Sequence, residues 1–292
     1  MINDISKLGI GTVQWGMRYG LSNKKATLET IRNILFYANR LKIDTLDTAS
    51  VYGESEKLLG LNDLESFNII TKTPQFGVQN ISQNEVYQLN KAFFNSLKML
   101  KCNSIHSLLV HNINDILLPG GDAIILAMRK LKEEGYVNKI GISVYDSKQI
   151  DLIIKKFIPD LIQLPLNVLD QRMQISGHLE MLKKSGVEIH VRSVFLQGLL
   201  LMPIEKIPKY FDPIRPTILR WHKAANLYGL TLSQAALIFI RDNPYVDKMI
   251  IGFDDLAQFK VCTKDFLTKS SFDAKNLDCK DHKFLNPSNW KL

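Results

Sequence analysis

Long apolar runs and cysteines are scarce in this sequence. No apolar stretch approaches the roughly 18 residues that a membrane-spanning helix needs. The segment from Met1 to Gly9 lacks the basic region and apolar core of a secretion signal. The three cysteines, Cys102, Cys262 and Cys279, form no CxxC pair, and an odd count does not suit a disulfide framework. We therefore expect a folded cytoplasmic protein with reduced thiols, no membrane contact and no metal site.

Acidic residues are fewer than basic ones. The chain has 37 Lys and Arg against 29 Asp and Glu, a formal net charge of +8, and such an excess attracts anions. The lysines are scattered rather than gathered in a basic stripe with interleaved aromatics, so nothing indicates a nucleic-acid partner. A phosphate-bearing cofactor, an anionic substrate and ordinary solubilising lysines each account for the charge.

Two nucleotide-binding motifs are also missing. Gly9, Gly11 and Gly16 do not match the G-x-G-x-x-G fingerprint of the Rossmann fold, because Gln14 stands where the third glycine is needed. No phosphate-loop motif is present. A nucleotide cofactor must therefore bind to this chain by other means.

What the sequence does contain is a regular alternation of short apolar runs with longer segments of helical periodicity, which predicts βα units. The predicted strands are Leu8–Thr12, Thr45–Asp47, Asn68–Lys72, Ser107–His111, Lys139–Ser143, Leu161–Pro165, Glu188–Ser193 and Lys248–Gly252. The predicted helices include Leu28–Leu41, Val86–Leu100, Ala123–Glu134, Lys148–Lys156, His178–Ser185, Thr217–Tyr228 and Leu232–Arg241. Eight such units predict an α/β fold, a (β/α)8 TIM barrel, rather than an open doubly wound sheet. We expect one domain over residues 1–292, with residues 264–292 as a C-terminal tail.

Four polar side chains fall at or just after the ends of consecutive predicted strands. Asp47 ends the second strand, Tyr52 follows it, Lys72 ends the third strand and His111 the fourth. In a barrel these positions share one rim, where active sites form. A lysine held charged by an aspartate assists a tyrosine that donates a proton, and a histidine can orient a carbonyl. Each residue alone also has a structural explanation, such as Asp47 capping a helix near Ser55, but together they predict a catalytic site.

The segment from Asp47 to Gly60, DTASVYGESEKLLG, resembles the signature of the aldo/keto reductase family, and the resemblance extends from Gly9 to about Gln258. The resemblance implies a barrel enzyme that reduces a carbonyl, or oxidises the matching alcohol, with a nicotinamide cofactor bound across the rim. It also implies that Tyr52 is the general acid, that Lys72 and Asp47 tune it, and that His111 orients the substrate.

The same resemblance implies a set of cofactor-binding residues. Ser143 and Gln163 match positions that bind the nicotinamide amide, and the loop after the seventh strand matches one that approaches phosphates through backbone amides. The complete expected set is Gly11, Thr12, Asp47, Ser143, Gln163, Arg192, Ser193, Phe195, Gly198, Gly252, Phe253 and Gln258.

Three residues depart from the family's pattern. Val144 stands where many members have Asn, and Arg192 where many have an aromatic residue stacked on the nicotinamide, which a planar guanidinium can replace. Asp254 stands where an Arg or Lys often grips the 2′-phosphate of NADP. An acid there either accepts hydrogen bonds from a free ribose, favouring NAD(H), or faces solvent while a lysine serves. We expect NADP(H) over NAD(H) on the family's habit.

The substrate pocket is expected to be walled by Trp15, Tyr19, Tyr145 and Trp290. The string GTVQWG, the Arg192 loop and the ending Asn-Pro-Ser-Asn-Trp resemble bacterial members of surface-sugar pathways, which suggests a small carbonyl substrate such as a sugar or nucleotide sugar. Two rival functions are a non-catalytic, cofactor-binding barrel that acts as a regulatory subunit and a metal-dependent hydrolase. The sequence does not indicate the oligomeric state.

Overall fold

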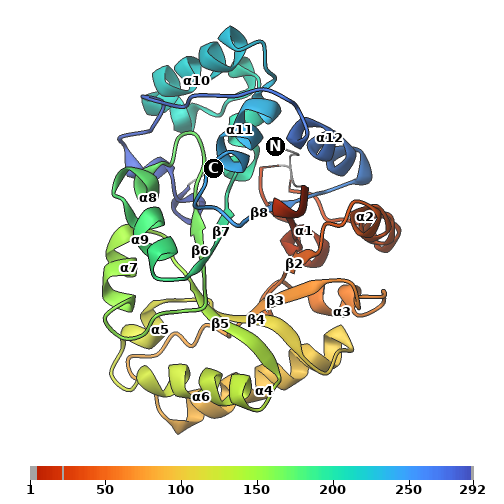
Figure 1. The fold of residues 1–292 in the computed structure, drawn as a ribbon, viewed down its shortest axis with the longest axis vertical. Coiled ribbons are helices and arrows are strands. Elements are labelled where there is room, and N and C mark those ends of the chain that lie inside the picture. Colours follow the sequence, from red (N-terminus) through yellow and green to blue (C-terminus); the bar gives the residue numbers. More distant parts are fainter. Residues whose placement is uncertain (1–4, 22, 291–292) are drawn as a thin grey trace.

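The computed structural model describes residues 5–21 and 23–290, and its eight strands close into a parallel barrel in the order of the sequence (Figure 1). The strands are β1 (Leu8–Gly11), β2 (Thr45–Asp47), β3 (Asn68–Lys72), β4 (Ile105–Val110), β5 (Val137–Ser143), β6 (Leu161–Pro165), β7 (Glu188–Arg192) and β8 (Lys248–Gly252). Closure is direct, because Gly11 of β1 pairs with Gly252 of β8. The predicted (β/α)8 barrel is confirmed.

Helices surround this barrel (Figure 1). They are α1 (Val13–Gly16), α2 (Leu28–Arg40), α3 (Ser55–Leu59), α4 (Gln83–Leu100), α5 (Asn114–Leu117), α6 (Asp122–Glu133), α7 (Ser147–Ile153), α8 (Arg172–Ile175), α9 (His178–Lys184), α10 (Arg215–Leu227), α11 (Leu232–Arg241) and α12 (Leu256–Phe266). Within the described ranges, none of them has the length and apolarity to cross a membrane.

Local sequence explains where the main helices begin. The Thr27 hydroxyl accepts a hydrogen bond from the Thr30 amide at the start of α2. Ser82 begins α4 with a capping box that Glu85 completes, and α11 begins at Thr231 in the same way. Each cap satisfies backbone donors that the first helical turn leaves free.

The side chains of the strands are largely buried and fill the interior of the barrel. Every residue of β1 and of β6 is buried, as expected for parallel strands covered by helices on their outer side. A second apolar cluster lies between the loop after β6, α10, α11 and the C-terminal segment. There the Cys279 amide donates to the Leu169 carbonyl at 2.8 Å, and Phe284 is buried. The described part of the expected tail, residues 264–290, begins inside α12 and packs against the loop after β6 and against α10.

Candidate active site

A buried ion pair links the ends of β2 and β3. The Lys72 ammonium donates to both oxygens of Asp47, at 2.7 and 2.8 Å, and to the Thr48 carbonyl at 2.9 Å. Lys72 is 3% exposed and Asp47 4%. Burial alone would lower the pKa of Lys72, but the charge of Asp47 and the hydrogen bonds outweigh it, so the pKa of Lys72 is raised. Lys72 is therefore a cation at neutral pH.

Tyr52 lies beside this pair. The Lys72 nitrogen is 5.2 Å from the centre of the Tyr52 ring. Burial raises the pKa of Tyr52, and the charge of Lys72 lowers it. The effect of burial is the larger, so the pKa of Tyr52 is raised overall. Tyr52 therefore keeps its proton at neutral pH and is available as a proton donor.

His111 completes the group, one residue after the end of β4. Its ring meets that of Tyr52 edge-on, with the centroids 5.9 Å apart. Burial, followed by the charge of Lys72, lowers the pKa of His111 from 6.5 to about 4. The imidazole is thus neutral at pH 7, and its Nδ1 is buried without a hydrogen-bond partner. A neutral imidazole keeps one N–H, which can donate one hydrogen bond.

Close backbone packing fixes the loop that carries Tyr52. A Cβ on Gly16 would lie 1.6 Å from the Tyr52 carbonyl oxygen and 2.6 Å from the Ser55 nitrogen, so only glycine allows α1 to approach this loop. The Ser55 hydroxyl donates to the Thr12 hydroxyl at 2.7 Å, and Thr12 donates to the Asp47 carbonyl at 3.0 Å. The role of Gly16 in positioning Tyr52 was not predicted from the sequence.

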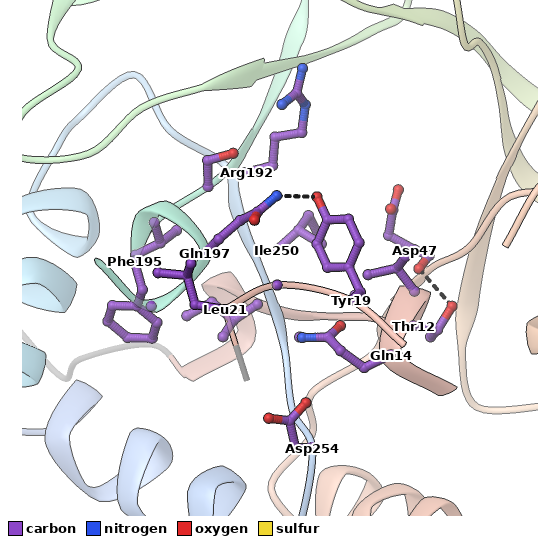
Figure 2. A pocket seen from close by; sticks show the side chains of 18 of the residues that line it. Thr12, Gln14, Tyr19, Leu21, Asp47, Arg192, Phe195, Gln197, Ile250 and Asp254 are labelled. Atoms are coloured by element: carbon purple, nitrogen blue, oxygen red, sulfur yellow. Dashed lines mark hydrogen bonds between the residues drawn. The ribbon is translucent and has the colours of Figure 1, made fainter. Parts of the chain in front are cut away.

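A cavity of about 540 Å³ opens at this rim (Figure 2). Asp47 and Tyr52 line it. Lys72 and His111 do not, but Lys72 contacts the Asp47 carboxylate and the His111 ring contacts the Tyr52 ring. Of the expected cofactor residues, those that line the cavity are Gly11, Thr12, Asp47, Gln163, Arg192, Ser193, Phe195, Gly198, Gly252 and Gln258. Tyr19 lines it as well. Most of the cofactor-binding residues implied by the resemblance therefore line one cavity.

Three of the four expected pocket-wall residues lie elsewhere. Trp15 is fully buried in the core, where its indole nitrogen donates to the Phe253 carbonyl at 3.3 Å. Trp290 packs against Phe211 with ring centroids 4.8 Å apart. The guanidinium carbon of Arg192 lies 4.2 Å from the centre of the Tyr145 ring, and Tyr145 does not line the cavity. The expectation was wrong for the two tryptophans, because residue type does not reveal whether an aromatic side chain packs inward or faces the rim. For Tyr145, which contacts the cavity-lining Arg192, it stays a prediction.

Two expected cofactor residues also lie outside the cavity lining. Phe253 is 2% exposed and packs edge-on against Phe259, with centroids 5.2 Å apart. Ser143 is 4% exposed and pairs with Gln163 in the sheet register. The side chain of Phe253 packs in the core, so only its backbone is placed to contact a cofactor.

Two side chains that line the cavity, those of Gln163 and Arg192, are held by hydrogen bonds to neighbouring residues. The Gln163 amide donates to Asp47 at 2.8 Å, so it adds a third side-chain hydrogen bond to this carboxylate. Arg192 donates to the Val144 carbonyl at 3.1 Å while its guanidinium stacks on Tyr145. Among the side chains that line the cavity within the described ranges, Arg192 is the one cation.

The loop after β7 contains unusual backbone conformations that no sequence signal indicated. Ser193, Leu196 and Gln197 have φ values of 61°, 47° and 53°, which side-chain-bearing residues seldom adopt. The Gln197 amide donates to the Tyr19 hydroxyl at 3.1 Å, so this loop contacts the segment after β1 across the cavity (Figure 2). Backbone strain of this kind is often retained where a loop contributes to a binding site.

The cavity also fits a nicotinamide nucleotide chemically. Its lining combines one cation, Arg192, with the polar side chains of Gln163, Ser193 and Gln197, a mixture that suits a phosphate-bearing ligand. Gly252 leaves room for the Gln14 carboxamide, since a Cβ there would lie 2.2 to 2.6 Å from it.

Comparison with known proteins agrees with this site. The model of the aldo/keto reductase family matches residues 7–277, nearly the whole chain. The chain belongs to the aldo/keto reductase family. It is therefore an oxidoreductase of a family that acts on small carbonyl compounds with nicotinamide cofactors.

Solved structures of the family share the fold. The apo form of aldo-keto reductase AKR11C1 from Bacillus halodurans has a TM-score of 0.73 and 21% identity, covering 95% of this chain and 94% of that one. The glycerol dehydrogenase AKR11B4 from Gluconobacter oxydans has a TM-score of 0.69 and 21% identity, covering 91% and 88%. No curated protein sequence matches the chain.

Proposed function

We propose that this aldo/keto reductase reduces a carbonyl group with NADH or NADPH, and that Tyr52 is its general acid. The observation that carries the proposal is the buried Lys72–Asp47 pair beside a protonated tyrosine that lines the cavity. Burying two charges is costly, and such a pair at a cavity wall points to chemistry as well as to stability.

Each residue has a defined part in this reaction. When the nicotinamide cofactor is bound, it supplies the hydride that goes to the carbonyl carbon. Tyr52 gives its proton to the carbonyl oxygen and becomes a phenolate, which the nearby Lys72 cation stabilises. Asp47 keeps Lys72 charged and in place. Neutral His111 donates a hydrogen bond to the same oxygen and polarises the carbonyl.

The test is a panel of aldehydes and ketones assayed with each reduced nucleotide, followed through the absorbance of the reduced nicotinamide. Cofactor oxidation that depends on a carbonyl compound supports the proposal. A purified protein that binds neither nucleotide, and oxidises neither with any member of the panel, contradicts it.

For the substrate we propose a sugar or nucleotide sugar, reduced in the cytoplasm. Arg192 places a cation on the cavity wall, where the phosphates of a nucleotide sugar would be attracted, and a solved relative is a glycerol dehydrogenase, which acts on a small polyol. The three free cysteines agree with a reducing compartment. Ketose, aldose and keto-sugar nucleotide substrates should then have a higher kcat/KM than simple aliphatic aldehydes, and the reverse order would contradict this choice.

A further inference from the structure

A second cavity, of about 580 Å³, lies at the opposite end of the barrel from the catalytic group. Asn68 and Ile105, the first residues of β3 and β4, line it, whereas Lys72 and His111 stand at or just beyond the far ends of these strands. The other walls are the segment after α3 and the loop between α4 and β4. The described residues that line the two cavities do not overlap. Small-molecule sites usually have volumes of about 300–1,000 Å³, so this cavity has the size of one.

Close packing fixes the walls of this second cavity. A Cβ on Gly60 would lie 2.0 Å from the Met99 carbonyl oxygen, so glycine is needed where the segment after α3 meets the end of α4. On the other wall, Lys101 follows α4 in the left-handed conformation, with a φ of 53°, and the Cys102 amide donates to the Leu97 carbonyl at 3.2 Å. The walls are therefore preformed, and a ligand would bind with little cost for ordering the protein.

Carboxamides are the commonest polar groups of the lining. The four asparagines are Asn62, Asn68, Asn103 and Asn138. Asn62 and Asn68 each donate to a neighbouring protein oxygen, at 2.8 and 3.2 Å, while their own carboxamide oxygens have no partner among the described residues. The side chains of Asn103 and Asn138 are exposed and make no hydrogen bond within the same ranges. Each carboxamide offers both donors and an acceptor, so the cavity presents several accessible groups of both kinds to a ligand.

The remaining side chains favour an uncharged, non-covalent ligand. Phe67 is half-buried and adds an aromatic face, against which the carbon atoms of a ring can pack. Asp63 and Glu65 outnumber Lys101, the lysine of this lining, so a phosphate or carboxylate would not be attracted. Burial is the largest cause that raises the pKa of the Cys102 thiol, which therefore stays protonated at neutral pH and is a poor nucleophile.

We propose that this second cavity binds a neutral saccharide, with the carboxamides of Asn103 and Asn138 hydrogen-bonded to its hydroxyls and Phe67 against its ring. A sugar hydroxyl donates and accepts, as a carboxamide does, so one asparagine can pair with two adjacent hydroxyls. The site is separate from the catalytic cavity and does not depend on the proposed function.

The test is NMR titration of the protein, labelled with 15N at its asparagines, with the methyl glycosides of glucose, galactose and mannose. A methyl glycoside has no free carbonyl, so it is not a substrate for the proposed reduction. The double variant N103A/N138A removes two exposed carboxamides and identifies their signals. N33A is the matched control, because Asn33 is an exposed asparagine on α2 that does not line the cavity. S104W fills the cavity without removing a carboxamide.

At least one glycoside should shift the side-chain signals of Asn103 and Asn138 in a saturable way and leave those of Asn33 unmoved. The double variant should bind that glycoside roughly tenfold more weakly, the effect expected of two lost hydrogen bonds. S104W should abolish binding, and N33A should keep the wild-type dissociation constant. Unmoved signals with every glycoside, a double variant that binds like the wild type, or shifts with inorganic phosphate alone would each overturn the proposal. None of these results changes the carbonyl assay that tests the proposed function.

Discussion

Replacing Lys72 by methionine separates the structural and chemical contributions of the buried ion pair. The variant leaves the Asp47 carboxylate, 4% exposed, with the Gln163 amide as its remaining side-chain donor and removes two hydrogen bonds of 2.7 and 2.8 Å. Removing one partner of a buried pair costs about 3–5 kcal/mol, so the free energy of unfolding should fall by that amount. Turnover should fall by roughly 10²- to 10⁴-fold, because the Tyr52 phenolate loses its cation.

The double variant K72M/D47N distinguishes the two contributions. It removes the stranded negative charge, while the asparagine oxygen still accepts from Gln163, so most of the lost stability should return. Activity should stay as low as in K72M, because the cation is still missing. Urea denaturation gives the stability and steady-state kinetics give the turnover. A K72M variant within threefold of wild-type kcat, or a double variant that regains activity, would refute the reasoning.

Two further predictions concern His111 and Gly16. In the ligand-free protein His111 should titrate near pH 4, below its ordinary 6.5, because burial and the Lys72 charge oppose its protonation. As the pH falls from 6.5 toward 4, His111 takes up a proton in the unfolded chain but not in the folded one. The free energy of unfolding should therefore fall across that window, and it should fall less in H111Q. NMR titration of the histidine ring signals gives the pKa directly, and a value near 6.5 would be inconsistent with the burial described. Gly16→Ala should lower kcat/KM and cost roughly 1–3 kcal/mol of stability by pushing the Tyr52 loop away. Its control is Gly135→Ala. There the φ of 81° makes an alanine costly for stability, but no atom lies within 4 Å of the new Cβ, so kcat/KM should stay as in the wild type.

The barrel was predictable because its signals are local and repeated. Six strands, β1, β2, β3, β6, β7 and β8, begin where the apolar runs predicted them, and the main helices have caps or amphipathic periodicity. The β4 boundary differs: the strand ends at Val110, so His111 lies just beyond it. The helix α12 was not predicted, and α3 was considered only as a helix near Ser55 that Asp47 could cap. In α3 five residues are too few to show a clear helical period.

The clustering of Asp47, Tyr52, Lys72 and His111 was also predictable, because strand ends in a parallel barrel must meet at one rim. What escaped prediction depends on contacts that are distant in sequence or on backbone conformation. Tyr19 and Gln197 meet across 178 positions, and Ser193 adopts a positive φ without being glycine. Trp15 and Trp290 were misplaced because residue type does not reveal which way a side chain faces.

The most direct test of the central claim is Tyr52→Phe, which removes only the hydroxyl that donates the proton. With whichever carbonyl substrate the panel identifies, kcat should fall by roughly 10²- to 10⁴-fold. The dissociation constant of the preferred nucleotide and the free energy of unfolding should both stay close to the wild-type values. A Y52F variant that turns over at the wild-type rate would show that the proton comes from another group and would contradict the account.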